Sequence, residues 1–241
     1  MPVILHVETS TRVCSAGISK DGSIIAARED NSGGHSHSTL LTCFIDEVIS
    51  EAGIVAADVS AVAASSGPGS YTGLRIGVSV AKGFCYARDI PLIAADTMLA
   101  LADNALIKLS EEKQFISPAA IETILCPMID ARRMEVYHAL FRHDLTKVAG
   151  TAASVIDKDS FSDILESGKI IFFGDGADKC KNLIISNNAF FLEGVWPSVY
   201  GMVREAEMKY SKGDFVDVAY FEPFYLKDFV AGKPKVKGLY S

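Results

Sequence analysis

A glycine-rich run between two apolar segments is the feature that most constrains how this chain can fold. The run covers residues 65–77 and has the sequence SSGPGSYTGLRIG, with apolar residues 59–64 before it and 76–87 after it. Gly67 and Gly69 permit backbone angles that other residues resist, and the proline between them fixes one torsion. The pattern therefore predicts a strand, a tight turn and a helix.

The same turn raises the question of whether it binds an anion. Free N–H groups at a helix N-terminus attract anions, which makes Gly67, Gly69, Ser70 and Thr72 a candidate anion site and Ser70 or Thr72 a candidate helix cap. The turn is not a P-loop, because no Gly-Lys-Ser/Thr follows it. Its glycines, with Gly73 as the third, have the spacing GxGxxxG, one residue longer than the dinucleotide fingerprint. We favour a structural turn, with phosphate binding as the alternative.

The segments around the turn predict a complete α/β unit in the first half of the chain. Three short strands joined by tight turns come first, with Asp21-Gly22 as a hairpin signal. An amphipathic helix that Gly53 ends comes next. In chain order we expect strands at 3–7, 14–19 and 24–28, a helix at 40–52, a strand at 59–64, a helix after the glycine turn, a strand at 91–95 and a helix at 97–109.

The second half repeats this order loosely. Residues 110–122 are mixed and polar, and they mark a candidate boundary between one lobe at 1–109 and a smaller lobe at 110–241. The predicted class is α/β, with an antiparallel edge on a parallel core and helices that cover mixed sheets. The halves share no visible identity, so an internal duplication is a hypothesis of architecture alone. We expect strands at 123–129, 134–141, 152–156 and 169–173, a glycine turn at 174–177, and helices at 160–166 and 198–212.

Composition narrows the function. The chain has 241 residues, of which 49% are apolar and 22% charged, so we expect a globular protein. A net charge of −7 argues against a protein that grips nucleic acid by itself. No apolar run is long enough for a membrane span and the N-terminus lacks a signal-peptide pattern, which predicts a cytoplasmic protein without membrane contact. The basic tail is interpreted as solvated, with a binding role as the alternative; its lysines are Lys227, Lys233, Lys235 and Lys237.

Residues with metal-binding or nucleophilic side chains do not form a recognisable site. His35 and His37 flank Ser36 without a third ligand nearby, so we expect surface histidines and a helix cap at Ser36 or Ser38. The cysteines show no paired spacing and are interpreted as small buried residues in a reducing compartment; they are Cys14, Cys43, Cys85, Cys126 and Cys180.

The end of the first predicted strand carries an acid. Glu8 is followed by Thr9, Ser10 and Thr11. An acid at this place can hold a metal–phosphate complex, whose phosphates would need backbone N–H groups close by. Hydrogen bonds between the acid and its own turn are the alternative, which we favour.

The helix after the glycine turn has two stripes. Gly73, Gly77 and Ala81 recur at four-residue spacing. Interior glycines cost about 1 kcal/mol each against alanine, which a chain accepts where backbones must approach closely. This stripe can pack on the chain's own sheet, can serve as a docking surface for another protein, or can do both. The neighbouring polar stripe consists of Arg75, Ser79, Lys82 and Tyr86.

These motifs together resemble the TsaB (YeaZ) family over about residues 3–102. The resemblance rests on ILHVETST at 4–11, GPGSYTGLRIG at 67–77 and PLI at 91–93. MIDAR at 128–132 and EPFYL at 222–226 match weaker family landmarks in the second half. One departure is Glu8, where the family usually has Asp.

The resemblance implies a two-lobed actin-like, or RNase H-like, ATPase-class fold and a role in making N6-threonylcarbamoyladenosine in tRNA. It implies a non-catalytic scaffold or activator, once called glycoprotease-like, that pairs with the catalytic sibling TsaD and is joined by the small ATPase TsaE. It further implies a homodimer when alone and only indirect contact with tRNA. From the small-residue stripe we expect the partner interface on the helices at 40–52 and 73–86; its residues are Leu41, Phe44, Val48, Gly73, Arg75, Gly77, Ala81 and Lys82.

The resemblance also separates this chain from the catalytic sibling. The sibling's two metal-binding histidines correspond here to Thr97 and Leu101, neither of which is a useful ligand for iron or zinc. We therefore expect no catalytic residue, metal or cofactor. The alternative is an ATP-dependent small-molecule kinase or ATPase of the same fold, and a third hypothesis is a metalloprotease.

Overall fold

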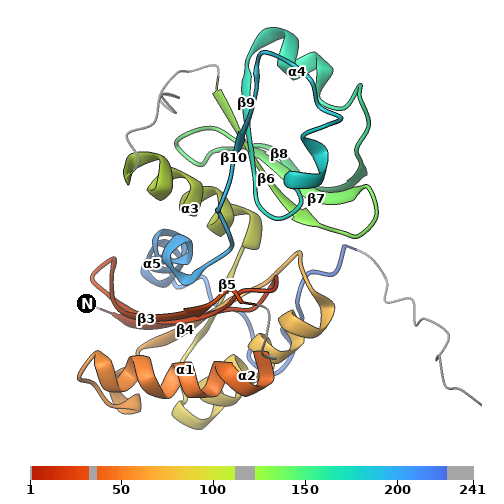
Figure 1. The fold of residues 1–241 in the computed structure, drawn as a ribbon. Coiled ribbons are helices and arrows are strands. Elements are labelled where there is room, and N and C mark those ends of the chain that lie inside the picture. The colour runs from red at the N-terminus through yellow and green to blue at the C-terminus, as the bar shows by residue number, and fades with distance from the viewer. Residues whose placement is uncertain (1, 33–36, 112–122, 227–241) are drawn as a thin grey trace, which may run out of the picture.

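The structure is a computed structural model that describes residues 2–32, 37–111 and 123–226, and it contains two five-stranded sheets. The sheets lie in two lobes, one above the other in Figure 1. Their strand orders are β3-β2-β1-β4-β5 and β10-β9-β6-β7-β8. The predicted α/β class with mixed sheets in two lobes is thus what the chain adopts.

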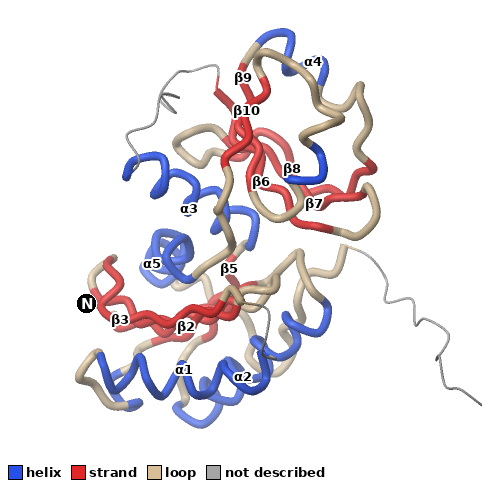
Figure 2. The backbone as a smooth tube through the Cα atoms, in the orientation of Figure 1, coloured by secondary structure: helices blue, strands red, loops and turns tan. Residues whose placement is uncertain are grey.

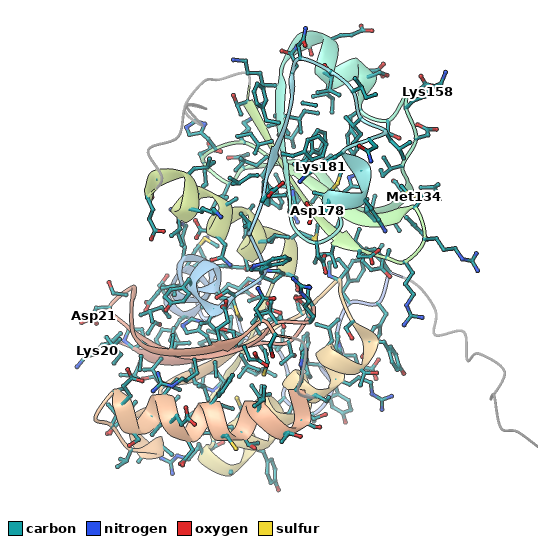
Figure 3. All side chains as sticks on the ribbon, in the orientation of Figure 1. Lys20, Asp21, Met134, Lys158, Asp178 and Lys181 are labelled. Atoms are coloured by element: carbon teal, nitrogen blue, oxygen red, sulfur yellow. The ribbon has the colours of Figure 1, made fainter. Side chains whose placement is uncertain are left out.

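The first sheet has the predicted antiparallel edge and parallel core. β1 (Val3–Glu8), β2 (Cys14–Lys20) and β3 (Ser23–Asp30) form an antiparallel meander. β4 (Ala61–Ser65) pairs in parallel with β1, and β5 (Leu92–Ala95) pairs in parallel with β4. The β2–β3 hairpin turns at Asp21-Gly22, both with positive φ, and Figure 3 shows Lys20 and Asp21 at its tip.

Helices cover both faces of this sheet. α1 (His37–Glu51) and α2 (Tyr71–Arg88) lie on one face, and α5 (Val203–Lys212) lies on the other (Figure 1). A 3₁₀ helix, Ala56–Asp58, precedes β4, and Gly53 ends α1 with a φ of +66°. The core beneath α1 and α2 is formed by buried apolar side chains from these helices and from β1, β2 and β4.

The second sheet repeats the connections of the first. β6 (Thr123–Asp130), β7 (Glu135–Phe141) and β8 (Lys147–Val155) are antiparallel, and β9 (Lys169–Phe173) and β10 (Ala189–Leu192) continue the sheet in parallel. α4 (Ser162–Ser167) and a 3₁₀ helix (Asp178–Cys180) connect them. β6 to β10 therefore have the same order and directions as β1 to β5, which supports the hypothesis of an internal duplication at the level of topology. β10 was not predicted, because its four half-buried residues show no alternation.

The chain divides between the lobes differently from the predicted boundary at 109 and 110. α3 (Thr97–Glu111) buries Met98 and Leu101 against the second sheet, in one core with Phe141 and Phe173. The late helix, predicted as one element, is a 3₁₀ helix (Val199–Met202) followed by α5, and both pack on the first sheet. A helix belongs to the lobe that buries its apolar face, which sequence position alone does not reveal.

Asp96 connects the two lobes where β5 ends. Its Oδ1 accepts hydrogen bonds from the backbone N–H groups of Met98, at 2.8 Å, and of Leu99, and so caps α3. Its Oδ2 lies 2.8 Å from Nζ of Lys147 on β8. Its own N–H donates to Oε2 of Glu205 on α5 at 2.8 Å. One residue thus links α3, the second sheet and α5.

α2 lies unusually close to the turn that follows β1. Oγ1 of Thr9 donates to the carbonyl oxygen of Gly73 at 2.8 Å. A Cβ atom at Gly73 would lie 2.1 Å from the Thr9 carbonyl oxygen, and one at Gly77 would lie 2.2 Å from Thr9 Oγ1. The stripe of small residues on α2 therefore packs on the chain itself, as one of the two compatible hypotheses predicted.

No helix among the described residues has the length and apolar character that crossing a membrane requires.

Gly73→Ala is expected to lower the free energy of unfolding by about 1–3 kcal/mol, because the new Cβ meets a backbone oxygen that cannot rotate away. Gly83→Ala is the matched control on the same helix, since no atom lies within 4 Å of its Cβ position. This control should gain up to about 1 kcal/mol from helix propensity. Urea unfolding of the two variants measures the difference, and equal stabilities would contradict the close contact.

Candidate functional site

The glycine turn directs several of its N–H groups into the chain itself. The Gly67 N–H donates to Oγ1 of Thr97 at 3.1 Å, and the Ser70 N–H donates to the Ser10 carbonyl oxygen at 2.6 Å. The Gly73 N–H donates to Oγ of Ser70 at 3.2 Å, so Ser70 is the helix cap, as predicted. These bonds fit the structural role that we favoured for the turn. The anion site at Gly67, Gly69, Ser70 and Thr72 stays a prediction.

Glu8 is fully buried and bonded to its own turn. Its Oε1 accepts a hydrogen bond from the Ser10 N–H at 2.6 Å, the local arrangement that we favoured. Its Oε2 has no hydrogen-bond partner among the described residues. Burial raises the pKa of the Glu8 carboxyl, and hydrogen bonds from Ser10 oppose that rise.

Other buried polar groups share this face of the first sheet. His6 Nε2 is 2.7 Å from Oγ of Ser19, and burial lowers the pKa of His6 to about 3, which keeps the ring neutral. His6 Nδ1 and the hydroxyl of Ser198 are buried without partners in the described chain. We did not predict this group, although His6 and Glu8 alternate with apolar Leu5 and Val7, a signal that could have found it.

The exposed side of α1 and α2 carries a shallow groove of about 450 Å³. α2 supplies most of its lining, and α1 supplies Ser38 at one end. The groove is largely apolar along its floor and has a guanidinium at its rim. The residues from α2 are Tyr71, Thr72, Arg75, Ile76, Ser79 and Val80.

Most residues of the predicted partner interface do not line this groove. Arg75 is exposed on it, Phe44 is half-buried, and Lys82 is half-buried with its Nζ donating to the Ala219 carbonyl oxygen at 3.0 Å. The other five are buried in the chain's own core, because the apolar and small-residue stripes of both helices face the sheet. They are Leu41, Val48, Gly73, Gly77 and Ala81.

The remaining predicted residues have structural surroundings. His37 starts α1, where its Nε2 lies 2.7 Å from the Thr11 carbonyl oxygen. His35, Ser36 and the tail lysines lie outside the described residues, while Ser38 lies within the first turn of α1. Four cysteines are buried as expected, but Cys43 is exposed on α1, contrary to our expectation.

The MIDAR landmark, residues 128–132, covers the end of β6 and the turn after it, which several hydrogen bonds hold in place. The Asp130 N–H donates to Oδ1 of Asp175 at 3.0 Å, and Lys179 forms an ion pair with the Asp130 carboxylate. Lys179 Nζ also donates to the carbonyl oxygens of Arg133 and Glu135, at 2.8 and 2.7 Å. On the same lobe, Asp178 and Lys181 form an ion pair at 3.1 Å (Figure 3). These contacts fix the turn and the segment after β9 against each other.

Glu8→Gln is expected to stabilise the protein at pH 7, because the glutamine carries no charge to bury. The raised pKa lets the folded state hold a proton that the unfolded state loses above about pH 4.5, so stability falls as the pH rises past that value. The advantage of the glutamine variant should vanish near pH 4 and grow towards pH 7. Urea unfolding across this range measures it, with exposed Glu166→Gln on α4 as the control. An advantage independent of pH would contradict the buried carboxylate.

Comparison with known proteins shows which relatives share this sequence. The chain is 26% identical to the "tRNA threonylcarbamoyladenosine biosynthesis protein TsaB" of Escherichia coli (strain K12) over 236 residues, which cover 95% of this chain and 96% of that relative. It is 23% identical to the protein of the same name from Haemophilus influenzae over 249 residues, with 95% of each chain covered. A shorter match, 45% identical over 62 residues, covers 26% of this chain and 18% of a "tRNA N6-adenosine threonylcarbamoyltransferase" of Streptococcus pneumoniae.

Solved structures confirm the fold. "YeaZ from Pseudomonas aeruginosa" superimposes with a TM-score of 0.74 at 22% identity, covering 94% of this chain and 100% of that one. The family model described as "TsaD: tRNA N6-adenosine threonylcarbamoyltransferase" matches residues 28–183, which is more than half of the chain. The chain therefore belongs to the family of that model and, within it, to the TsaB (YeaZ) group.

Proposed function

We propose that this protein is a non-catalytic scaffold or activator that pairs with a TsaD-type catalytic subunit for the formation of N6-threonylcarbamoyladenosine in tRNA. The names of its relatives, all in threonylcarbamoyladenosine biosynthesis, support the pathway. The groove on the exposed side of α1 and α2 is the observation that carries the pairing. It offers Ile76 and Val80 as apolar contacts and Arg75 as a cation at its rim.

The buried state of Thr97 and Leu101 supports the non-catalytic role. The resemblance places the metal-binding histidines of the catalytic sibling at these two positions. Here Thr97 accepts the hydrogen bond from the Gly67 N–H, and Leu101 lies in the core beneath α3. Both side chains are fully buried and hold the fold together. Catalysis then rests with the partner, and this chain acts by binding it.

Further partners follow from the same role. A TsaE-type ATPase would join the pair, and the exposed face of α1 and α2 would form a homodimer when the catalytic subunit is absent. The net charge of −7 fits a protein that meets tRNA through its partner. The cytoplasm, where tRNA is modified, is the expected compartment.

The alternative, an ATP-dependent kinase or ATPase, needs nucleotide contacts at residues 8–11 and the glycine turn. The unpartnered Oε2 of Glu8 is the one observation in its favour. The engaged N–H groups of Gly67, Ser70 and Gly73 count against it. Calorimetry of the lone chain with ATP and magnesium separates the two functions, because micromolar binding would favour the kinase or ATPase.

Ser79→Tyr is expected to weaken binding of the TsaD-type subunit at least about tenfold, because the ring fills the groove. Titration of the purified subunit measures the affinity, and tRNA modification in a reconstituted system should fall in parallel. Ser167→Tyr, at the exposed end of α4 in the other lobe, is the matched control. Gly77 is unsuitable as a probe, since any side chain there meets Thr9. Unchanged affinity of Ser79→Tyr would exclude the groove as the interface.

A further inference from the structure

The segment after α5 crosses the edge of the first sheet at β5 and runs along α2. Residues 214–226, here called the C-terminal strap, contain neither helix nor strand in Figure 2, where they are the tan tube that leaves α5. The Val216 N–H donates to the Leu92 carbonyl oxygen at 2.9 Å, at the edge of β5. Lys82 binds the strap at Ala219, and the Phe224 N–H donates to the Ser66 carbonyl oxygen at 2.7 Å. The strap is thus held along its length.

The glycine turn accommodates the strap at its closest point. Gly67 has a φ of +102°, and a Cβ atom there would lie 2.6 Å from the Phe224 carbonyl oxygen. The absence of a side chain at this position lets the strap reach the start of α2. The next residue, Tyr225, therefore lies beside Tyr71, which lines the groove.

The ring of Tyr225 on the strap packs at a tilt against Tyr71, the first residue of α2. The ring centroids are 4.9 Å apart with an interplanar angle of 43°. Tyr71 in turn holds Arg75: the guanidinium carbon lies 5.3 Å from the ring centroid, and Nη1 donates to the phenolic oxygen at 3.0 Å. Tyr71 and Arg75 both line the groove, so the strap supports the groove from outside through a chain of three side chains.

This arrangement leaves the Arg75 guanidinium oriented and without a carboxylate partner among the described residues. None of the ion pairs formed by the described residues includes Arg75. Glu222 on the strap is exposed. Burial raises the pKa of Tyr225, and the charge of Glu222 adds to that rise, whereas the charge of Arg75 opposes it. An arginine keeps several N–H donors in a rigid fork, which matches a carboxylate in two parallel hydrogen bonds.

We propose that Tyr225 is a positioning residue of the docking surface: through Tyr71 it fixes Arg75 to pair with an acidic side chain of the partner. This inference rests on the proposed function, because the partner is the TsaD-type subunit that occupies the groove. It adds the chemistry that the partner must present, which is an apolar surface with a carboxylate next to it. The pair with Arg75 gives the orientation, and the apolar floor gives contact area.

The first experiment compares three variants for affinity towards the purified catalytic subunit. Tyr225→Ala should weaken binding by roughly threefold to tenfold, the range for loss of an aromatic pair. Tyr225→Phe keeps the ring and should stay close to the wild type. Tyr220→Ala removes a ring from the same strap that is 85% exposed and should leave the affinity unchanged. Equal losses for Tyr225→Ala and Tyr220→Ala would overturn the proposal.

The second experiment separates positioning from general stability. The wild-type affinity should fall with ionic strength, and Arg75→Gln should both weaken binding and flatten this salt dependence, because the pair with the partner is lost. Tyr225→Ala should flatten it as well, and should cost little further affinity in the Arg75→Gln background. If Tyr225→Ala lowers only the unfolding midpoint of the lone chain and leaves the salt dependence intact, its role is structural and the proposal fails.

Different outcomes overturn the proposed function and the role of Tyr225. A wild-type chain that does not bind the catalytic subunit overturns the proposed function, and this inference with it. Normal binding by wild type together with unchanged affinity for Arg75→Gln overturns the inference alone, and leaves the groove to be tested by Ser79→Tyr.

Discussion

The close approach of α2 to the turn after β1 determines the geometry of the first lobe. β1 and β4 are neighbouring parallel strands, so the turns that follow them meet at one edge of the sheet. Thr9 donates into the first turn of α2 at Gly73, where no Cβ atom could fit. This contact fixes where α2 begins and how it is rotated. The outward face of the helix, and therefore the groove, depends on two residues that never reach the surface.

The glycine turn after β4 also brings the C-terminal strap to the start of α2. Gly67 leaves room for the backbone of Phe224, and the strap then delivers Tyr225 to the first residue of α2. The glycine-rich turn packs between two segments of its own chain, the turn after β1 and the C-terminal strap. Its glycines allow close packing on both sides, and this packing fixes which face of α2 is exposed.

Sequence patterns predicted the elements well, because hydrophobic periodicity and turn residues act locally. Asp21-Gly22, Gly53 and Ser70 have the turn and capping roles expected of them. The surface was harder to predict. The stripes through Leu41 and Gly77 are the strongest signals in α1 and α2, and for that reason they are buried on the chain's own sheet. The residues that a helix exposes lie between its strongest apolar stripes. An amphipathic pattern does not indicate which of these exposed residues would contact another protein. The contact between the rings of Tyr225 and Tyr71 joins distant parts of the chain, which no local pattern encodes.

The second lobe shows how much depends on the segment that follows the glycine turn. There too a glycine turn follows the fourth strand, and Gly174, with a φ of +96°, would place a Cβ atom 2.2 Å from the Met128 carbonyl oxygen at the end of β6. The constraint that organises the first lobe is therefore present twice. In the first lobe the turn opens into an 18-residue helix, whereas in the second it opens into a 3₁₀ helix of three residues, Asp178–Cys180. The same close packing after the fourth strand is therefore followed by a long helix in one lobe and by a single short turn in the other, and the difference lies in the chain that follows the glycines.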